Sequence, residues 1–151
     1  MKVAVAADHA GFAYKSILLK DIAKHGFEIL DLGTYAETPP TDYPDHASAV
    51  AQAIINGQAE RGIIICGSGV GVSVAANKFK GIRAGVCHDT YSAHQSVEHD
   101  DANVICIGER IVGIELAREI IFSFLTAIFS NEARHQKRLD KIKDIEYQNM
   151  K

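Results

Sequence analysis

The strongest structural signal in this sequence is an unbroken apolar run at residues 62–66, Gly-Ile-Ile-Ile-Cys. Consecutive β-branched side chains favour a strand, and both faces of that strand must be covered because neighbouring side chains point to opposite faces. Strands of this kind occur in parallel sheets, where crossover helices cover both faces. The run therefore predicts a parallel sheet between two layers of helices.

The rest of the chain repeats this alternation of strand and helix. We expect strands at residues 2–7, 27–32, 62–66, 83–87 and 103–107, helices at residues 12–25, 45–56, 91–99, 113–129 and 132–147, and a short helix after residues 66–71. All three prolines fall within residues 35–44, which we expect to form a connection. The expected fold is α/β: a three-layer, Rossmann-like, doubly wound five-stranded parallel sheet with a C-terminal helix.

Length, charge and cysteine content limit the possible functions. A chain of 151 residues is expected to form a single domain, residues 1–151. Its 16 basic and 19 acidic residues give a net charge of -3, which does not favour a nucleic-acid partner. No apolar stretch approaches the roughly 20 residues of a membrane span, and no leader is recognisable, so no membrane partner is expected. Three cysteines without a Cys-x-x-Cys pair indicate reduced thiols and a cytoplasmic protein.

The predicted helix at residues 113–129 is apolar around more of its surface than packing on one sheet requires. An exposed apolar face of this size indicates a protein interface, so we expect a homodimer or larger homo-oligomer. The last helix, at residues 132–147, is charged and has far fewer apolar residues than the helix before it, so we expect it on the outside of the molecule.

In open parallel sheets, ligands bind outside the carboxyl ends of the strands, near the point where the strand order reverses. A carboxylate, imidazoles, a thiol and a guanidinium come directly after predicted strands, so we expect them at one rim. The residues concerned are Asp8, His9, Gly33, Thr34, Cys66 to Gly71, His88, Asp89, Gly108, Glu109 and Arg110.

The run from Cys66 to Gly71 reads Cys-Gly-Ser-Gly-Val-Gly. Alternate glycines allow a tight turn that directs several backbone N–H groups at one point, which favours an anion site. The run is neither the G-x-G-x-x-G dinucleotide fingerprint nor a P-loop. A tight turn without a ligand is the alternative.

Cys66 abuts this turn, and the amides there should favour its thiolate, which makes it a candidate base or nucleophile. The alternative is a small buried apolar residue, which is the interpretation we prefer for Cys87 and Cys106.

Arg134 and Arg138 are four residues apart on a predicted helix, so both guanidinium groups can reach a single phosphate. A solvated basic face, shared with Lys137 and Lys141, is the alternative. The histidines are scattered, with His94 and His99 five residues apart, and this spacing does not match a metal site on a helix. No metal is expected.

Several motifs, taken together and in order, resemble the ribose-5-phosphate isomerase B group of the ribose/galactose isomerase family. The similarity runs nearly from end to end, and the wider family also holds subunits of galactose-6-phosphate isomerase. The matching motifs are Asp8-His9-Ala10-Gly11-Phe12, Thr41-Asp42-Tyr43-Pro44, Cys66-Gly67-Ser68-Gly69-Val70-Gly71, Ala75-Ala76-Asn77-Lys78, Gly81-Ile82-Arg83-Ala84, Gly108-Glu109-Arg110 and Arg134-His135-Gln136.

The resemblance implies a cofactor-free aldose–ketose isomerase of the pentose phosphate pathway that interconverts D-ribose 5-phosphate and D-ribulose 5-phosphate through a cis-enediolate. In the family, the thiol at the position of Cys66 moves the proton between C2 and C1. The resemblance further implies roles for other residues: enediolate binding by the amides of Gly67, Ser68, Gly69, Val70 and Gly71, proton relay by Ser68, a sugar-hydroxyl contact by Asp8, ring opening by His99, and phosphate binding by His9, Arg110, Arg134 and Arg138.

Family members are dimers or tetramers, and the resemblance implies sites at the subunit interface, near His99 and Arg110. One position departs from the family, because Asp100 stands where asparagine is common. An ionised carboxylate can only accept hydrogen bonds, whereas asparagine can also donate. We therefore expect Asp100 at the substrate site to cost stabilisation of the enediolate, unless it instead holds a protonated His99.

Two other functions stay open. A hexose-6-phosphate isomerase would use the same residues on a longer sugar, and a non-enzymatic sugar-phosphate sensor would bind without turnover.

Overall fold

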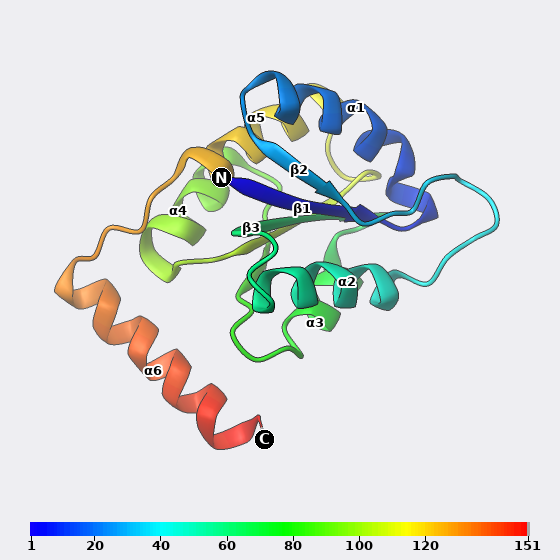
Figure 1. Cartoon of the computed structure of the whole chain (residues 1–151). Coiled ribbons are helices and arrows are strands. Elements are labelled where there is room, and N and C mark those ends of the chain that lie inside the picture. Colours follow the sequence, from blue (N-terminus) through cyan, green and yellow to red (C-terminus); the bar gives the residue numbers. More distant parts are fainter. Residues whose placement is uncertain (151) are drawn as a thin grey trace.

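The computed structural model describes residues 1–150, and its centre is a sheet of five parallel strands (Figure 1). The strands are β1 (Lys2–Ala7), β2 (Glu28–Asp31), β3 (Arg61–Cys66), β4 (Ala84–Val86) and β5 (Val104–Gly108), in the spatial order β2-β1-β3-β5-β4. The helices are α1 (Phe12–Lys24), α2 (Tyr43–Ile55), α3 (Val70–Ala76), α4 (Thr90–Asp100), α5 (Ile114–Thr126) and α6 (Ala133–Asn149), and a short 3-10 helix, η1 (His9–Gly11), precedes α1.

Helices cover both faces of the sheet, as the buried run at residues 62–66 requires. Val3 and Val5 of β1 point into a core shared with α1, α4 and α5. The alternate residues Ala4 and Ala6 point into a second core shared with α2 and α3. The predicted three-layer, doubly wound parallel sheet is therefore confirmed.

Two glycines in the left-handed conformation form the turns that follow α1 and α2. Gly26 (φ 84°) follows α1 and Gly57 (φ 70°) follows α2, both in the left-handed region that glycine adopts without strain. Each turn leads the chain into the amino end of a strand, and an added Cβ at either glycine would meet nothing within 4 Å.

Two predicted boundaries are wrong. Helix α2 begins at Tyr43, so Pro44 belongs to its first turn and not to the connection. Proline fits there because the first N–H groups of a helix have no partner within the helix. Helix α5 ends at Thr126, three residues before the predicted end, and Ala127 is extended. Arg61 explains this end, because its guanidinium donates to the carbonyls of Phe124 and Ala127 at 2.5 and 2.7 Å.

The wide apolar surface of α5 is largely covered within one chain. Ile120, Ile121, Phe124 and Leu125 are buried, and α5 lies against α4 as well as against the sheet and α1. Leu116 is the large apolar residue of this helix that stays exposed, at 40%. Packing within one chain therefore explains most of the apolar surface of this helix, and a subunit contact through Leu116 and the exposed Ile128 that follows the helix stays a prediction.

Helix α6 extends away from the layered body, as expected for an outer helix (Figure 1). Its buried residues are His135 and Leu139, near its start. At its far end, Glu146 accepts the N–H of Gly81 at 2.6 Å, and Lys80 lies 5.2 Å from the ring centre of Tyr147. Among residues 1–150, no helix has the length and apolarity that crossing a membrane requires.

Candidate active site

A cleft of about 370 Å³ opens at the carboxyl ends of β1 and β3, where the strand order reverses. Asp8 and His9 follow β1, Cys66 ends β3, and Ser68 lies in the loop after it. Arg110, in the loop after β5, completes the polar lining. The structure thus brings together seven of the predicted site residues, these five with Gly67 and Gly71, from the ends of three separate strands.

The Cys66 side chain lies at the floor of this cleft and is largely buried. Its Sγ accepts the backbone N–H of Gly69 at 3.0 Å. Gly69 has a φ of 78°, a left-handed conformation that turns the chain back so that this amide reaches the sulfur. The loop thus directs one of its backbone amides at the sulfur, the kind of contact that an anion at this position would also accept.

The loop from Gly67 to Gly71 is tightly enclosed. The guanidinium of Arg110 lies over Gly67, where an added Cβ would be 3.3 Å from Nη1. The ring of Tyr43 lies over Gly71, where an added Cβ would be 2.8 Å from ring carbons. Ser68 Oγ accepts the N–H of Val70 at 3.3 Å. A side chain at position 71 would therefore displace the Tyr43 ring, whereas one at position 67 would need only a small movement of the Arg110 guanidinium.

Asp8 and His9 are held by local hydrogen bonds. Asp8 is buried, and its Oδ1 accepts the N–H of Gly11 at 3.1 Å, which caps η1. His9 Nδ1 lies 3.2 Å from both the backbone N and the backbone O of Thr41, so either neutral tautomer has a partner there. Thr41 Oγ1 in turn lies 2.9 Å from His46 Nε2, and burial lowers the pKa of His46. These contacts fix the His9 ring at the edge of the cleft.

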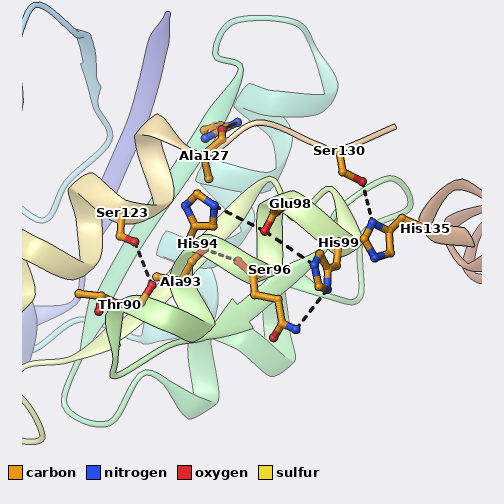
Figure 2. A network of polar contacts seen from close by, with 12 residues as sticks. Thr90, Ala93, His94, Ser96, Glu98, His99, Ser123, Ala127, Ser130 and His135 are labelled. Atoms are coloured by element: carbon orange, nitrogen blue, oxygen red, sulfur yellow. Dashed lines mark hydrogen bonds and ion pairs between the residues drawn. The ribbon is translucent and has the colours of Figure 1, made fainter. Parts of the chain in front are cut away.

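His99 does not line this cleft. It lies on α4 and stacks on His135 of α6, with ring centres 4.0 Å apart and ring planes inclined by 26° (Figure 2). Its Nδ1 lies 3.1 Å from Nε2 of Gln95, and its Nε2 lies 3.7 Å from Glu98. The predicted ring-opening histidine therefore joins α4 to α6 within one chain.

His135, the partner in this stack, is 1% exposed. Its Nδ1 lies 2.6 Å from Ser130 Oγ, and its Nε2 has no hydrogen-bond partner among residues 1–150. Burial lowers the pKa of His135, and the adjacent His99 lowers it further. The ring is accordingly held neutral between the two helices.

The arginine pair also lies outside the cleft. Arg134 and Arg138 line a separate groove along α6 together with Lys137 and Lys141. Arg134 Nε is paired with Glu132 at 2.8 Å. In a single chain, the thiol and the paired arginines therefore do not share one cleft, because α6 carries the pair away from the ends of β1 and β3.

Asp100 is likewise remote from the thiol. It is the last residue of α4, and it lines a mostly apolar cleft between the β4 region and α6, to which Ile142 and Ile145 contribute.

Cys87 and Cys106 are buried core residues, as preferred from the sequence. Burial raises the pKa of both thiols, so both are uncharged. Within residues 1–150, no group of three or more His, Cys, Asp and Glu side chains is arranged to hold a metal ion.

Tyr43 and Ile111 line the cleft, although the sequence analysis gave neither a role. Tyr43 belongs to a motif shared with the family, but it was given no role because it precedes Pro44 in a segment expected to be irregular. The signal that could have found it is Gly71, a glycine inside a helix, which indicates close approach of another group.

Comparison with known proteins places these residues in a family. The model of the family described as Ribose/Galactose Isomerase matches residues 3–142. The chain is 46% identical to ribose-5-phosphate isomerase B of Escherichia coli over 96% of each chain, and 40% identical to D-erythrulose-4-phosphate isomerase 2 of Mycolicibacterium smegmatis over 94% of this chain and 95% of the other. It is similar to the crystal structure of ribose-5-phosphate isomerase B from Mycoplasma genitalium with bound ribulose-5-phosphate, with a TM-score of 0.92, 38% identity, and 98% and 97% of the two chains covered.

Proposed function

The chain belongs to the ribose/galactose isomerase family, and we propose that it interconverts D-ribose 5-phosphate and D-ribulose 5-phosphate through a cis-enediolate, with Cys66 as the base. The protein is an aldose–ketose isomerase. This reaction moves one proton between neighbouring carbons and one between neighbouring oxygens, with no net gain or loss of electrons. Its chemistry therefore requires no redox cofactor.

The hydrogen bond from the Gly69 amide to Cys66 Sγ is the observation that supports this role best. A thiolate removes the C2 proton of the open-chain aldose, the electron pair forms the C1–C2 double bond, and the resulting thiol returns the proton to C1 of the enediolate. A base within hydrogen-bond reach of the reacting carbon contributes about 10²- to 10⁴-fold to such a step.

Other groups in the cleft suit the oxygens of the intermediate. The backbone amides of the loop from Gly67 to Gly71 stabilise the enediolate charge, as fixed donors do without reorganising. Ser68 relays a proton between O1 and O2, and Asp8 contacts a sugar hydroxyl. His9 and Arg110, at the edge of the same cleft, bind the phosphate.

A second copy of the chain completes the site in this proposal. Within one chain, His99, Arg134 and Arg138 lie away from the cleft on α4 and α6. A homodimer or homotetramer that brings α6 of one copy to the cleft of another supplies two further cations for the phosphate and the imidazole for ring opening. We also retain a single domain, residues 1–151, acting in the cytoplasm, where thiols stay reduced.

Proton exchange in heavy water tests the reaction, the substrate and the base together. Wild-type protein incubated with ribose 5-phosphate in D₂O should form ribulose 5-phosphate that carries deuterium at C1, observed by NMR. Cys66→Ala should lose turnover by about 10³-fold or more while still binding the sugar phosphate in calorimetry. The matched control is Cys87→Ala, which removes a buried thiol and should retain turnover.

Turnover by Cys66→Ala at the wild-type rate would refute the role of the thiol. Binding without turnover by the wild-type protein would indicate a sugar-phosphate sensor instead.

A shorter sugar is the second candidate, since a relative with 40% identity is a D-erythrulose-4-phosphate isomerase. The alternative of a hexose-6-phosphate isomerase is tested with allose 6-phosphate and galactose 6-phosphate. Comparing kcat/KM for tetrose, pentose and hexose phosphates decides between them, and the proposal requires the pentose phosphate to give the highest value.

A further inference from the structure

His88 makes an unusual contact with the sheet. It follows β4, and its Nε2 accepts the backbone N–H of Gly108, the last residue of β5, at 3.0 Å. Strand β4 is three residues long, and the Cys87 N–H continues the pairing by donating to the Cys106 carbonyl at 3.3 Å. A longer strand would offer a main-chain carbonyl to the next amide of β5. At this position, His88 offers a ring nitrogen instead.

Gly108 supports the loop that carries the reactive thiol. An added Cβ on Gly108 would lie 2.8 Å from Ser68 Cα, and an added Cβ on Gly69 would lie 3.2 Å from the Gly108 nitrogen. The backbones of the two loops are therefore in direct contact. A shift of Gly108 would displace Gly69, whose amide donates to the sulfur of Cys66.

Gly108 also begins the loop that carries Arg110. The N–H of Glu109 donates to the Cys66 carbonyl at 2.9 Å, and the N–H of Arg110 donates to the Gly67 carbonyl at 3.1 Å. The two walls of the cleft, the thiol loop and the arginine loop, thus meet at Gly108. His88 holds Gly108 from the side opposite to β3.

We propose that His88 is a positioning residue for the reaction: its Nε2 fixes Gly108, and Gly108 fixes both the Gly69 amide at Cys66 Sγ and the guanidinium of Arg110 over Gly67. The ring does not line the cleft and contacts no reacting atom. The expected effect on kcat rests on the proposed function, whereas the expected effect on hydrogen–deuterium exchange does not.

Two substitutions of His88 that differ in how far their acceptor atom extends provide a matched test of the contact with Gly108. In glutamine, Oε1 extends about as far from the backbone as Nε2 of histidine, whereas Oδ1 of asparagine extends only about as far as Nδ1. His88→Gln therefore keeps an acceptor for Gly108, and His88→Asn places the same amide group too short to reach. The two variants have similar polarity, so they differ mainly in this contact.

We expect His88→Asn to lower kcat by about tenfold or more with a smaller change in KM, because misplacing catalytic groups by a fraction of an ångström has effects of this order. His88→Gln should restore kcat to within about threefold of wild type. His94→Asn, which changes an exposed histidine that contacts Glu98 on the same helix, should leave both constants unchanged.

Hydrogen–deuterium exchange followed by mass spectrometry supplies a readout that does not depend on activity. In His88→Asn, deuterium uptake should rise in peptides covering residues 66–71 and 104–112 and stay unchanged elsewhere, and His88→Gln should reverse the rise. Uptake that rises throughout the chain, or equal kcat values for the two variants, would overturn the positioning role. A wild-type protein without isomerase activity would refute the proposed function, and the exchange data would still test the anchoring of Gly108.

Discussion

At the scale of single residues, backbone conformation determines what Cys66 can do. The sulfur receives an amide hydrogen bond because Gly69 adopts a left-handed conformation, and that conformation packs the loop directly on the backbone of Ile107 and Gly108. Both requirements exclude a side chain at position 69. The chemistry of the thiol therefore depends on a residue that contributes no side-chain atoms.

We predict that Gly69→Ala lowers stability by about 1–3 kcal/mol and turnover by about 10²-fold or more, because strain and overpacking both displace the loop. The added Cβ would lie 3.1 Å from the Ile107 carbonyl carbon, which is backbone and cannot move aside cheaply.

Gly81→Ala is the control for this variant. Gly81 has a similar φ of 85°, but an added Cβ there would meet nothing within 4 Å. The Gly81→Ala variant should therefore lose stability through backbone strain alone, and it should retain turnover. Urea unfolding and steady-state kinetics measure both effects, and equal turnover in the two variants would contradict the prediction.

The residues of the cleft were predictable where the signal is local. Cys66, Ser68 and the glycines are adjacent in the sequence, and Asp8, His9 and Arg110 follow strands whose carboxyl ends must meet at one edge. The position of Tyr43 was not predictable in this way, because its place in the cleft depends on how α2 packs over α3.

At the scale of secondary structure elements, Arg61 determines where α5 ends. Its guanidinium donates to the carbonyls of Phe124 and Ala127, which would otherwise lack partners at the end of the helix. No pattern within residues 113–129 contains this information, since the capping side chain comes from the start of β3. The apolar residues beyond Thr126 continue a helical spacing that the cap interrupts.

We predict that Arg61→Met lowers the free energy of unfolding by about 2–4 kcal/mol, because two hydrogen bonds from a charged donor are lost. Lys2→Met is the control, since Lys2 begins the neighbouring strand β1 and pairs with exposed Glu28 at 3.0 Å, a surface pair worth about 0–1 kcal/mol. Urea denaturation followed by circular dichroism measures both values. Equal losses in the two variants would show that the cap contributes no more than a surface ion pair.

The stacked histidines make the contact between α4 and α6 sensitive to pH. The pKa of His135 is lowered from the ordinary value of 6.5, so the unfolded chain takes up a proton at a higher pH than the folded chain. Stability from this residue is present above pH 6.5 and decreases as the pH falls below 6.5 toward the folded pKa.

We therefore predict that wild-type protein loses more stability between pH 7.5 and pH 5.5 than His135→Gln, which does not titrate. His46, whose pKa burial also lowers, keeps part of the pH dependence in the variant. The exposed His94 supplies the control, and His94→Gln should show the wild-type loss. Urea unfolding at the two pH values measures the difference, and an identical loss in His135→Gln would contradict the prediction.

At the scale of the whole molecule, one chain carries two separate hollows that the proposed function combines into one site across two copies. The cleft holds the thiol, and the groove on α6 holds four cationic side chains. The sequence could not predict this separation, because the projection of α6 from the body depends on the packing of His135 and Leu139 and on contacts of its far end, where Glu146 accepts the N–H of Gly81. The spacing of Arg134 and Arg138 predicted that they lie on one face of the helix, and both line the same groove, but the spacing holds no information on which copy's cleft they would serve.

We predict that two inactive variants restore activity when mixed. Cys66→Ala lacks the base, and the double variant Arg134→Ala/Arg138→Ala lacks the guanidinium pair, but a mixed dimer contains one intact site. Random reassociation of equal amounts should recover about one quarter of wild-type activity, since half of the dimers are mixed and each has one of two sites intact.

The mixture must first be dissociated and reassociated, and each variant treated alone serves as the control. Activity that stays at the sum of the two separate variants would show that one chain forms the whole site.

The glycine turns at positions 26 and 57 lie at the amino edge of the sheet, at the opposite end from the thiol, and each opens onto empty space. Loop tips of this kind tolerate inserted sequence. A short epitope or a fluorescent reporter could therefore be spliced into either turn of an active enzyme. For the proposed oligomer, copies labelled in this way would make the exchange of partners visible in real time, without any alteration of the end of the sheet that carries the thiol.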